Sequence, residues 1–166
     1  MSDSNGGTHL VFGLAGEHYA APVADVEEVL EWQPITVVPR CPAYLLGIIN
    51  VRGSLIPVVD LRRRFGIAAA AAGDERHILV VRIEYAGERA QMGLVVDAVE
   101  GVINLDEEAV EPPPTVGGAI EGSAIRGLAR SGDRILLVVE PDALVPKEQL
   151  DADFDALAAA RDGERR

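Results

Sequence analysis

Few residues in this chain belong to the types that carry out catalysis. The three histidines, His9, His18 and His77, have no cysteine, histidine or carboxylate at metal-ligand spacing, so neither a metal nor a cofactor is expected. The single cysteine, Cys41, precedes Pro42 and is interpreted as a partly buried, small hydrophobic residue in a turn. The sequence contains no G-x-S-x-G nucleophile elbow and no Walker phosphate-binding loop. It therefore predicts a protein that is not an enzyme.

Three carboxylates, Asp60, Asp97 and Glu100, follow apolar segments, which is a position that acid–base pairs also use. We interpret them as residues that cap turns or form ion pairs with arginines. The candidate partners are Arg62, Arg63 and Arg126.

Two other charged residues interrupt apolar stretches. Glu28 lies within VADVEEVLEW, and Arg52 lies within GIINVRGSLIPVV. An arginine held against apolar surface loses hydration, so it should either extend to water or find a carboxylate. One interpretation places both residues on solvated surfaces, at a hairpin tip and on a helix face. The other is an ion pair at the edge of a protein-binding groove.

Composition narrows the classes of partner. The chain has 166 residues, and its 27 acidic against 15 basic residues give a formal net charge of −12, which should repel nucleic acid and anionic lipid. The longest uncharged apolar stretch, residues 42–51, is about half the ~20 residues that a membrane span needs. The first residues lack the features of a signal peptide. We expect a cytoplasmic protein that neither binds nucleic acid nor inserts into the membrane.

The first half of the chain is predicted to form two β-hairpins. Residues 1–8 are polar and glycine-rich and should be a flexible tail. Apolar runs flank Ala15-Gly16-Glu17 and, further along, Arg52-Gly53-Ser54, and each pattern predicts a hairpin with glycine in its turn.

Short helical segments and a loop are predicted around these hairpins. Val26, Val29 and Leu30 recur at helical spacing, which predicts a short helical turn leading into a strand. LRRRFG at 61–66 should be a short helix, and the alanine-rich residues 67–76 should form a mobile loop.

The second half is predicted to contain three strands over residues 77–105, an irregular proline-rich connection over 111–122, and a final hairpin turning at Ser131-Gly132-Asp133. Residues 147–166 have apolar side chains at helical spacing and predict a C-terminal helix with a short tail, which should pack on the barrels.

An internal similarity relates the two halves. AGEHYAAPVADVEEV at 15–29 and AGERAQMGLVVDAVEGV at 86–102 share a turn, an apolar strand and a similar acidic segment. The predicted fold is therefore mainly all-β. It consists of two twisted five-stranded antiparallel β-barrels that share a hydrophobic seam, with short helices and a C-terminal helix.

The order of the motifs resembles that of the bacterial chemotaxis coupling protein family (CheW). The shared series is V-x-E, P-x-x-P, G-I-I-N-x-R-G, P-V-V-D-L-R, L-V-V-D-x-V and the late G-D-x-x-L-L-V, and the resemblance extends over residues 9–146. One departure is Glu140-Pro141-Asp142, where the family often has a Leu-Asp pair.

This resemblance implies a CheW-like domain over 9–146, made of two intertwined SH3-like barrels. It implies an adaptor that binds the cytoplasmic tip of a methyl-accepting chemoreceptor and the regulatory domain of a CheA-type histidine kinase, and that is recruited to receptor arrays at the inner face of the membrane. The positions that match the family's receptor-binding groove are Val26, Glu28, Gly47, Asn50, Arg52 and Gly53. Glu28 and Arg52 would form its ion pair, whereas no residue is assigned to the kinase contact.

Two alternatives remain open at this point. A related adaptor of a pilus-motility or biofilm system would have the same sequence features, because the receptor that it recognises is encoded in the partner. A small-ligand-binding β-barrel would need a cavity lined by aromatic and polar groups, and the chain has only three Phe, three Tyr and one Trp.

Overall fold

The computed structural model describes residues 7–39, 42–68, 70–71, 73–85, 87–106, 109–112 and 124–145. The strands are β1 (Gly7–Leu14), β2 (Glu17–Pro22), β3 (Val26–Glu31), β4 (Leu45–Val51), β5 (Ser54–Asp60), β6 (His77–Tyr85), β7 (Glu88–Val96), β8 (Ala98–Leu105), β9 (Ile125–Ser131) and β10 (Arg134–Val139). Short helical elements are η1 (Val23–Asp25), α1 (Leu61–Arg64) and η3 (Pro141–Ala143). No helix in these ranges is long and apolar enough to cross a membrane.

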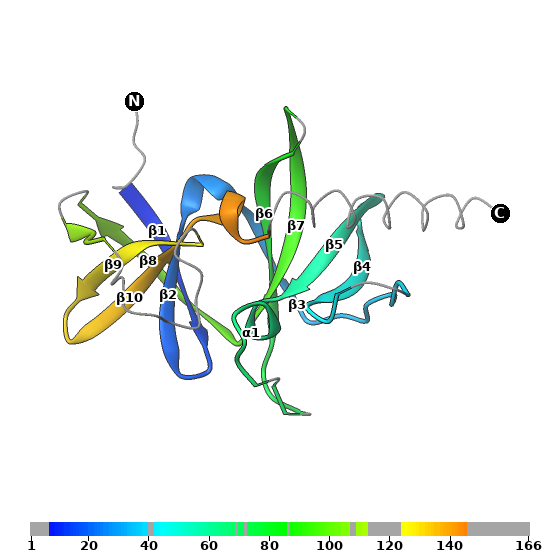
Figure 1. Ribbon diagram of the computed structural model, residues 1–166, viewed down its shortest axis with the longest axis horizontal. Coiled ribbons are helices and arrows are strands. Elements are labelled where there is room, and N and C mark those ends of the chain that lie inside the picture. The colour runs from blue at the N-terminus through cyan, green and yellow to red at the C-terminus, as the bar shows by residue number, and fades with distance from the viewer. Residues whose placement is uncertain are drawn as a thin grey trace.

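The strands form two five-stranded sheets that lie side by side as two lobes (Figure 1). The first barrel has the order β8-β1-β2-β10-β9, and the second has the order β3-β6-β7-β5-β4. A single backbone bridge extends the pairing beyond the edge strand of each sheet, between Thr36 and Ile48 in the second barrel and between Glu111 and Leu128 in the first. The predicted mainly-β fold of two five-stranded units is confirmed.

The predicted hairpins are present, and the backbone conformation of each turn allows the two strands to be joined by few residues. β1 and β2 turn at Ala15 and Gly16, which have φ angles of 54° and 85°. β4 and β5 turn at Arg52 and Gly53, with φ angles of 49° and 89°. Two consecutive residues with positive φ define the type I′ turn, whose twist matches that of antiparallel strands. β9 and β10 form the third predicted hairpin, with Gly132 in its turn.

The predicted helical turn over Val26, Val29 and Leu30 is wrong. The only helical residues there belong to η1, and the three apolar residues lie in β3. β3 carries a β-bulge, because Val26 pairs with Val81 and Glu28 with Val80, which leaves Glu27 as an extra residue. The side chains of β3 still alternate, with Val26, Glu28 and Leu30 partly buried and Val29 exposed, so an apolar residue on the exposed face produces a spacing that imitates a helix.

Other boundaries of the prediction need adjustment. Strand β1 begins at Gly7, so the last two residues of the expected tail are paired with β8. Helix α1 and the three strands of 77–105 occur where they were predicted. Cys41, most of the proline-rich connection and the predicted C-terminal helix over 147–166 lie outside the described residues.

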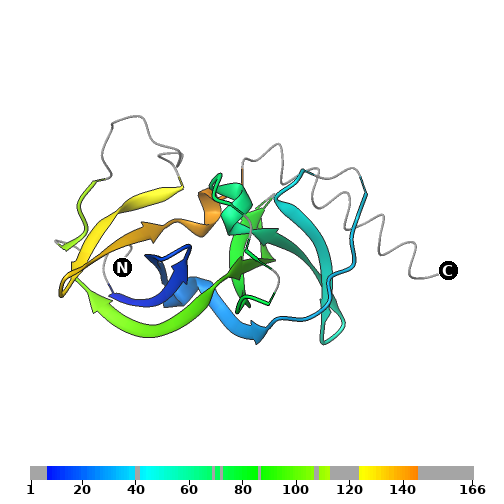
Figure 2. The same cartoon turned by 90° about the horizontal axis from the view of Figure 1, so that it is seen from below.

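The two barrels exchange strands. β3 follows β1 and β2 in sequence but pairs with β6 in the second barrel, and β8 follows β6 and β7 but pairs with β1 in the first barrel. Figure 2 shows β3 (blue) and β8 (lime green) running toward opposite lobes. Because neither sheet is complete without a strand from the other half of the sequence, the halves must fold together.

The exchange relates the halves by an approximate two-fold symmetry. β1, β2 and β8 of the first barrel correspond to β6, β7 and β3 of the second, and the parallel pair of β2 with β10 corresponds to that of β7 with β5. The similar segments at 15–29 and 86–102 therefore occupy corresponding places in the fold.

The described residues form three apolar clusters. One lies inside the first barrel and includes Val11, Leu136 and Val138. A second lies inside the second barrel and includes Ile56, Val58 and Ile78. The largest is the seam, to which both halves contribute, and there Tyr19 stacks between Phe12 and Phe65 with ring centroids 5.7 and 5.8 Å apart. Each such buried side chain contributes about 1.5–3 kcal/mol, so most of the apolar stabilisation shared by the barrels lies at this seam.

An ion pair spans the edge of the seam. Arg62, on α1, donates from Nε to Asp97 Oδ1 at 2.9 Å and from Nη2 to Asp97 Oδ2 at 2.6 Å. The backbone N–H of Ala15, in the β1–β2 turn, donates to the same carboxylate at 2.8 Å. Burial alone would raise the pKa of Asp97, but the hydrogen bonds from Arg62 and Ala15 outweigh that effect and lower the pKa. We call this group the Arg62–Asp97 latch.

The carboxylates proposed as partners of arginines are paired, with one change. Asp60 lies 3.4 Å from Arg63 and caps α1 by accepting from the N–H of Arg62. Glu100, however, contacts His18 at 2.9 Å and Arg134 at 2.6 Å, while Arg126 pairs with Glu140. Strand exchange explains the difference, since β8 places Glu100 beside β2 and the start of β10.

We expect the latch to contribute more to stability than an ordinary surface ion pair. Arg62→Met keeps the apolar stem but leaves Asp97 partly buried and short of donors, which should lower the free energy of unfolding by about 2–3 kcal/mol. Arg63→Met, at a more exposed pair, should cost less than about 1 kcal/mol. Urea unfolding of both variants measures the two values, and equal effects would contradict a special role for the latch.

His9 makes stability depend on pH. Its side chain is fully buried, Nδ1 lies 2.9 Å from the Gly7 carbonyl oxygen, and Nε2 has no hydrogen-bond partner among the described residues. Burial is the main cause that lowers the pKa of His9 below 6.5. The hydrogen bond to Gly7 raises the pKa, the charge of Arg126 lowers it and that of Asp25 raises it, and these smaller effects do not offset burial. His9 is therefore neutral in the fold at pH values where the unfolded chain already binds its proton.

The free energy of unfolding should thus be unaffected by His9 above about pH 6.5 and should fall, by up to about 1.4 kcal/mol per pH unit, as pH decreases from there toward the lowered pKa. In His9→Asn, whose Nδ2 can still donate to Gly7, this part of the slope should vanish. The measurement is the difference between the wild-type and variant stability curves from pH 7.5 to 5. Parallel curves would show that another group causes the acid sensitivity.

Candidate functional site

The sequence-predicted ion pair between Glu28 and Arg52 is present. Arg52 Nη1 donates to Glu28 Oε1 at 3.2 Å, and Arg52 Nη2 donates to Oε2, so the guanidinium holds the carboxylate with two donors. The residues are 24 positions apart in sequence. Glu28 comes from the exchanged strand β3 and Arg52 from the β4–β5 turn. The pair therefore joins two separate elements of the second barrel.

The turn fixes where Arg52 stands. Arg52 adopts a left-handed φ of 49°, which is unfavourable for a residue with a side chain, and Gly53 takes the second left-handed position. Asn50 Oδ1 accepts a hydrogen bond from the N–H of Gly53 at 2.9 Å, which closes the turn from inside. Three of the predicted site residues, Asn50, Arg52 and Gly53, thus form one rigid hairpin tip.

The ion pair is exposed on one side only. The Arg52 side chain is 73% exposed, whereas that of Glu28 is 25% exposed. The hydrogen bond from Arg52 is the main cause that lowers the pKa of Glu28, and the same bond raises the pKa of Arg52. Both groups therefore stay charged near neutral pH, and the pair presents a guanidinium face to solvent.

Gly47 and Val26 have supporting positions. A Cβ at Gly47 would lie 2.0 Å from the carbonyl oxygen of Thr36, so a side chain there would disrupt the bridge between Thr36 and Ile48. Gly47 sits at a bulge in β4 with a φ of 152°. Val26 is partly buried and packs against the seam cluster. Gly47 thus shapes the backbone under the site, whereas Val26 links the start of β3 to the seam.

Sequence reasoning missed two exposed apolar residues that follow Glu28 along the chain, of which Val29 projects to the opposite face of β3 from Glu28. Val29 is 41% exposed and Trp32 is 37% exposed, and both follow Glu28 along the chain. The Arg76 guanidinium lies 3.8 Å from the centre of the Trp32 ring, which holds the indole by a cation–π contact. The helical interpretation of this stretch had assigned Val29 to a buried face. Recognising the stretch as a strand would have placed Val29 on the surface, because side chains alternate between the two faces.

Among the described residues, the site combines a fixed ion pair with exposed apolar surface. Together with the fold, it defines the protein as one of two intertwined five-stranded β-barrels.

Comparisons with known proteins agree with this class. The family profile for the CheW-like domain matches residues 8–149. The chain is 32% identical over 150 residues to the chemotaxis protein CheW of Rhizobium meliloti, with 90% of this chain and 94% of that protein covered. It is 30% identical to the CheW of Bacillus subtilis, with 84% and 86% covered.

A solved structure gives the same result. The scaffolding protein TtCheW from Thermoanaerobacter tengcongensis has a TM-score of 0.75 and 38% sequence identity, with 84% of this chain and 92% of that chain covered. A shorter match joins the chain to the protein PilI of Pseudomonas aeruginosa, at 35% identity over 91 residues, covering 55% of this chain and 49% of PilI. The chain belongs to the CheW-like family.

Gly47 allows a test of its structural role. Gly47→Ala should lower the free energy of unfolding by about 1–3 kcal/mol, because the new methyl group forces Thr36 away. Gly53→Ala provides the control, since a Cβ there meets no atom within 4 Å and only the left-handed φ is unfavourable. Thermal and urea unfolding should show the larger loss for Gly47→Ala. A fully stable Gly47→Ala that fails in partner binding would instead make Gly47 a direct contact residue.

Proposed function

We propose that this protein is a non-catalytic signalling adaptor that couples the cytoplasmic tips of chemoreceptors to a CheA-type histidine kinase within a chemotaxis array. The observation that carries the proposal is the Glu28–Arg52 pair on a rigid hairpin tip in a protein of the CheW-like family. The proposed location is the cytoplasm, at the inner face of the membrane to which the receptors recruit it.

The receptor is assigned to the hairpin side of the second barrel. A receptor tip is a helical hairpin, and a helix docks well on a surface that offers apolar contacts beside fixed polar groups. Trp32, directly beyond the end of β3, offers exposed apolar area, and Arg52 offers a guanidinium whose position is set by Glu28. A surface fixed before binding loses little entropy on association, which supports a specific contact without a large area.

The kinase is assigned to apolar strand edges elsewhere on the barrels. β8 is an edge strand of the first barrel, and Val102 on it is 60% exposed. An edge of this kind can pair with a strand of a homologous barrel. Contacts of the two partners would then involve different barrels, as an adaptor that binds both at once requires.

The alternatives have less support. A pilus-motility adaptor is favoured only by the shorter match to PilI, which covers about half of each chain. A small-ligand-binding barrel is disfavoured because buried aliphatic side chains occupy the interiors of both barrels.

Replacing Arg52 by Ala should impair receptor-dependent kinase activation much more than folding or kinase binding. The variant removes the donor that positions Glu28 and the guanidinium that faces the receptor, whereas its exposure limits the effect on stability. The measurements on one preparation are a thermal melt, pull-down of the kinase regulatory domain, and kinase activation with receptor present.

Arg130→Ala is the matched control, because Arg130 is an exposed arginine near the hairpin turn of the first barrel. It should retain receptor-dependent activation. Normal activation by Arg52→Ala would remove Arg52 from the receptor site, and a collapsed melt would assign it a structural role instead.

A further inference from the structure

A small pocket opens at the mouth of the second barrel. This mouth is the end where β5 and β7 finish and β6 begins, at the far end of the β4–β5 hairpin from the Arg52 turn. Leu46 and Val95, which pack in the apolar cluster inside the barrel, line the pocket. Its other lining residues are Asp60, Arg62, Arg63, Ala70, Arg76 and Asp97. Barrel mouths are common places for ligand sites, and here the filled interior confines a ligand to the mouth.

One positive charge in this pocket lacks a counterpart. Three arginines and two aspartates line it, although the whole chain has a formal net charge of −12. Asp97 belongs to the Arg62–Asp97 latch, and Asp60 lies 3.4 Å from Arg63. Among the described residues, Arg76 forms no ion pair. The surplus positive charge of the lining is therefore that of Arg76.

Arg76 is held by an aromatic ring instead of a carboxylate. Its guanidinium carbon lies 3.8 Å from the centre of the Trp32 ring. Its Nε is buried and has no hydrogen-bond partner among the described residues. The indole ring offers no lone pair to the N–H donors, so the cation–π contact fixes the guanidinium without satisfying those donors. A buried donor without an acceptor is unfavourable, and an oxyanion bound at Arg76 would relieve this.

Arg63 has further unused donors beside the pocket. Its contacts with Asp60 and with the Ala43 carbonyl oxygen are each 3.4 Å long, and its Nη2 forms no hydrogen bond with the described residues. In Arg62, by contrast, all three guanidinium nitrogens donate to Asp97 or to a carbonyl oxygen. Arg63 and Arg76 can therefore donate to a ligand, whereas Arg62 contributes only its charge.

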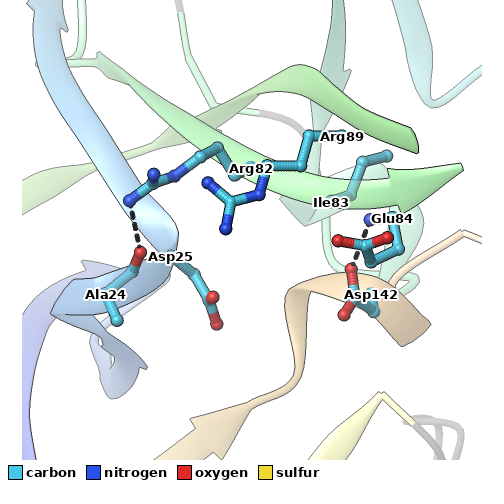
Figure 3. Close-up of a pocket in the computed structure, with 7 residues that line it drawn as sticks. All are labelled: Ala24, Asp25, Arg82, Ile83, Glu84, Arg89 and Asp142. Atoms are coloured by element: carbon cyan, nitrogen blue, oxygen red, sulfur yellow. Dashed lines mark hydrogen bonds between the residues drawn. The ribbon is translucent and has the colours of Figure 1, made fainter. Parts of the chain in front are cut away.

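The larger pocket of the structure, of about 270 Å³ between η1 and η3, is different (Figure 3). Two guanidinium groups, of Arg82 and Arg89, line it together with the carboxylates of Asp25, Glu84 and Asp142. Carboxylates are in excess there, and charges of both signs lie side by side. Its lining does not select one class of ligand, unlike the pocket at the mouth of the second barrel.

We propose that the mouth of the second barrel binds a carboxylate, with Arg76 as the main donor and Arg63 as the second. The carboxylate would come from an acidic side chain of a partner protein or from a small free acid, which present the same group. A guanidinium donates to the two oxygens of a carboxylate through two parallel N–H groups. The proposal does not depend on the assignment of the receptor site, because the Arg52 turn lies at the other end of the hairpin.

Charge and size favour a carboxylate over a phosphate. One surplus positive charge matches a monoanion, whereas a phosphate dianion would place a second negative charge beside Asp60 and Asp97. The pocket has a volume of about 90 Å³, and a water molecule occupies about 30 Å³. Room for about three water molecules accommodates a carboxylate and the methylene next to it.

The probe is sodium acetate, titrated into the full-length protein at neutral pH with sodium chloride adjusted to keep the ionic strength constant. Trp32 is the only tryptophan in the chain and contacts Arg76, so its fluorescence reports on this site. We expect a saturable change in Trp32 emission with half-saturation at roughly 10–100 mM, as suits one carboxylate held by a few charge-assisted hydrogen bonds.

Two variants remove the donors, and a third is the matched control. Arg63→Met leaves the contact between Arg76 and Trp32 in place and should raise the half-saturation concentration about tenfold. Arg76→Met also alters the surroundings of Trp32, so it is followed by amide chemical shifts of 15N-labelled protein, and the acetate-dependent shift of the Asp97 amide should vanish. Arg89→Met removes an equal charge at the start of β7, whose other end borders the pocket, and should bind as the wild type does.

The source of the carboxylate is tested with N-acetyl-glutamate amide, which presents the carboxylate of a protein side chain. Binding at least as tight as that of acetate supports a side chain, and binding of acetate alone supports a small free acid. The proposal is overturned if the wild type shows no saturable change up to about 200 mM acetate, or if inorganic phosphate binds more tightly than acetate. It is also overturned if Arg76→Met keeps the shifts or if Arg89→Met weakens binding as much as Arg63→Met.

Discussion

Strand exchange is the constraint on which the candidate site depends. Glu28 is encoded in the first half of the chain, directly after β2, yet β3 carries it into the second barrel beside β6. Arg52 is brought to the same place by the β4–β5 hairpin, at the other edge of that sheet. If β3 paired within its own half, the carboxylate would lie on the first barrel and Arg52 would have no partner at the hairpin tip. The site is thus a consequence of how the barrels are intertwined.

Strand exchange connects the barrels, and contacts at the seam must in addition fix their relative orientation. Apolar contacts are not directional, so the stacked rings of Phe12, Tyr19 and Phe65 hold the barrels together without fixing their angle strongly. The Arg62–Asp97 latch adds directional bonds, since one carboxylate receives donors from α1 and from the β1–β2 turn. A fixed angle between the barrels suits the proposed adaptor, which would present two partners to one another.

Local patterns predicted much of this architecture, and long-range pairing accounts for what they missed. The Arg52-Gly53 turn could be recognised because glycine beside a polar residue between aliphatic runs is typical of a tight hairpin, and the ion pair with Glu28 followed from the resemblance to a family. The strand character of 26–31 could not be recognised, because Val29 is an apolar residue on the exposed face, and only the pairing with β6 shows which face is buried. The same is true of Gly47, whose need to be glycine comes from Thr36, a residue outside the hairpin.

The symmetry that builds the seam leaves its two sides chemically different. Hydrogen bonding by the backbone repeats on both sides, since the amides of Ala15 and Glu84 each donate to a carboxylate at nearly the same distance. Side-chain charge does not repeat, because Arg62 and Asp142 occupy corresponding places, four residues beyond Val58 in β5 and Val138 in β10. A fold that needed two latches for stability would lose several interactions at this exchange, whereas one latch and the shared apolar cluster already constrain both barrels. The second side is therefore free of the structural requirement that fixes Arg62.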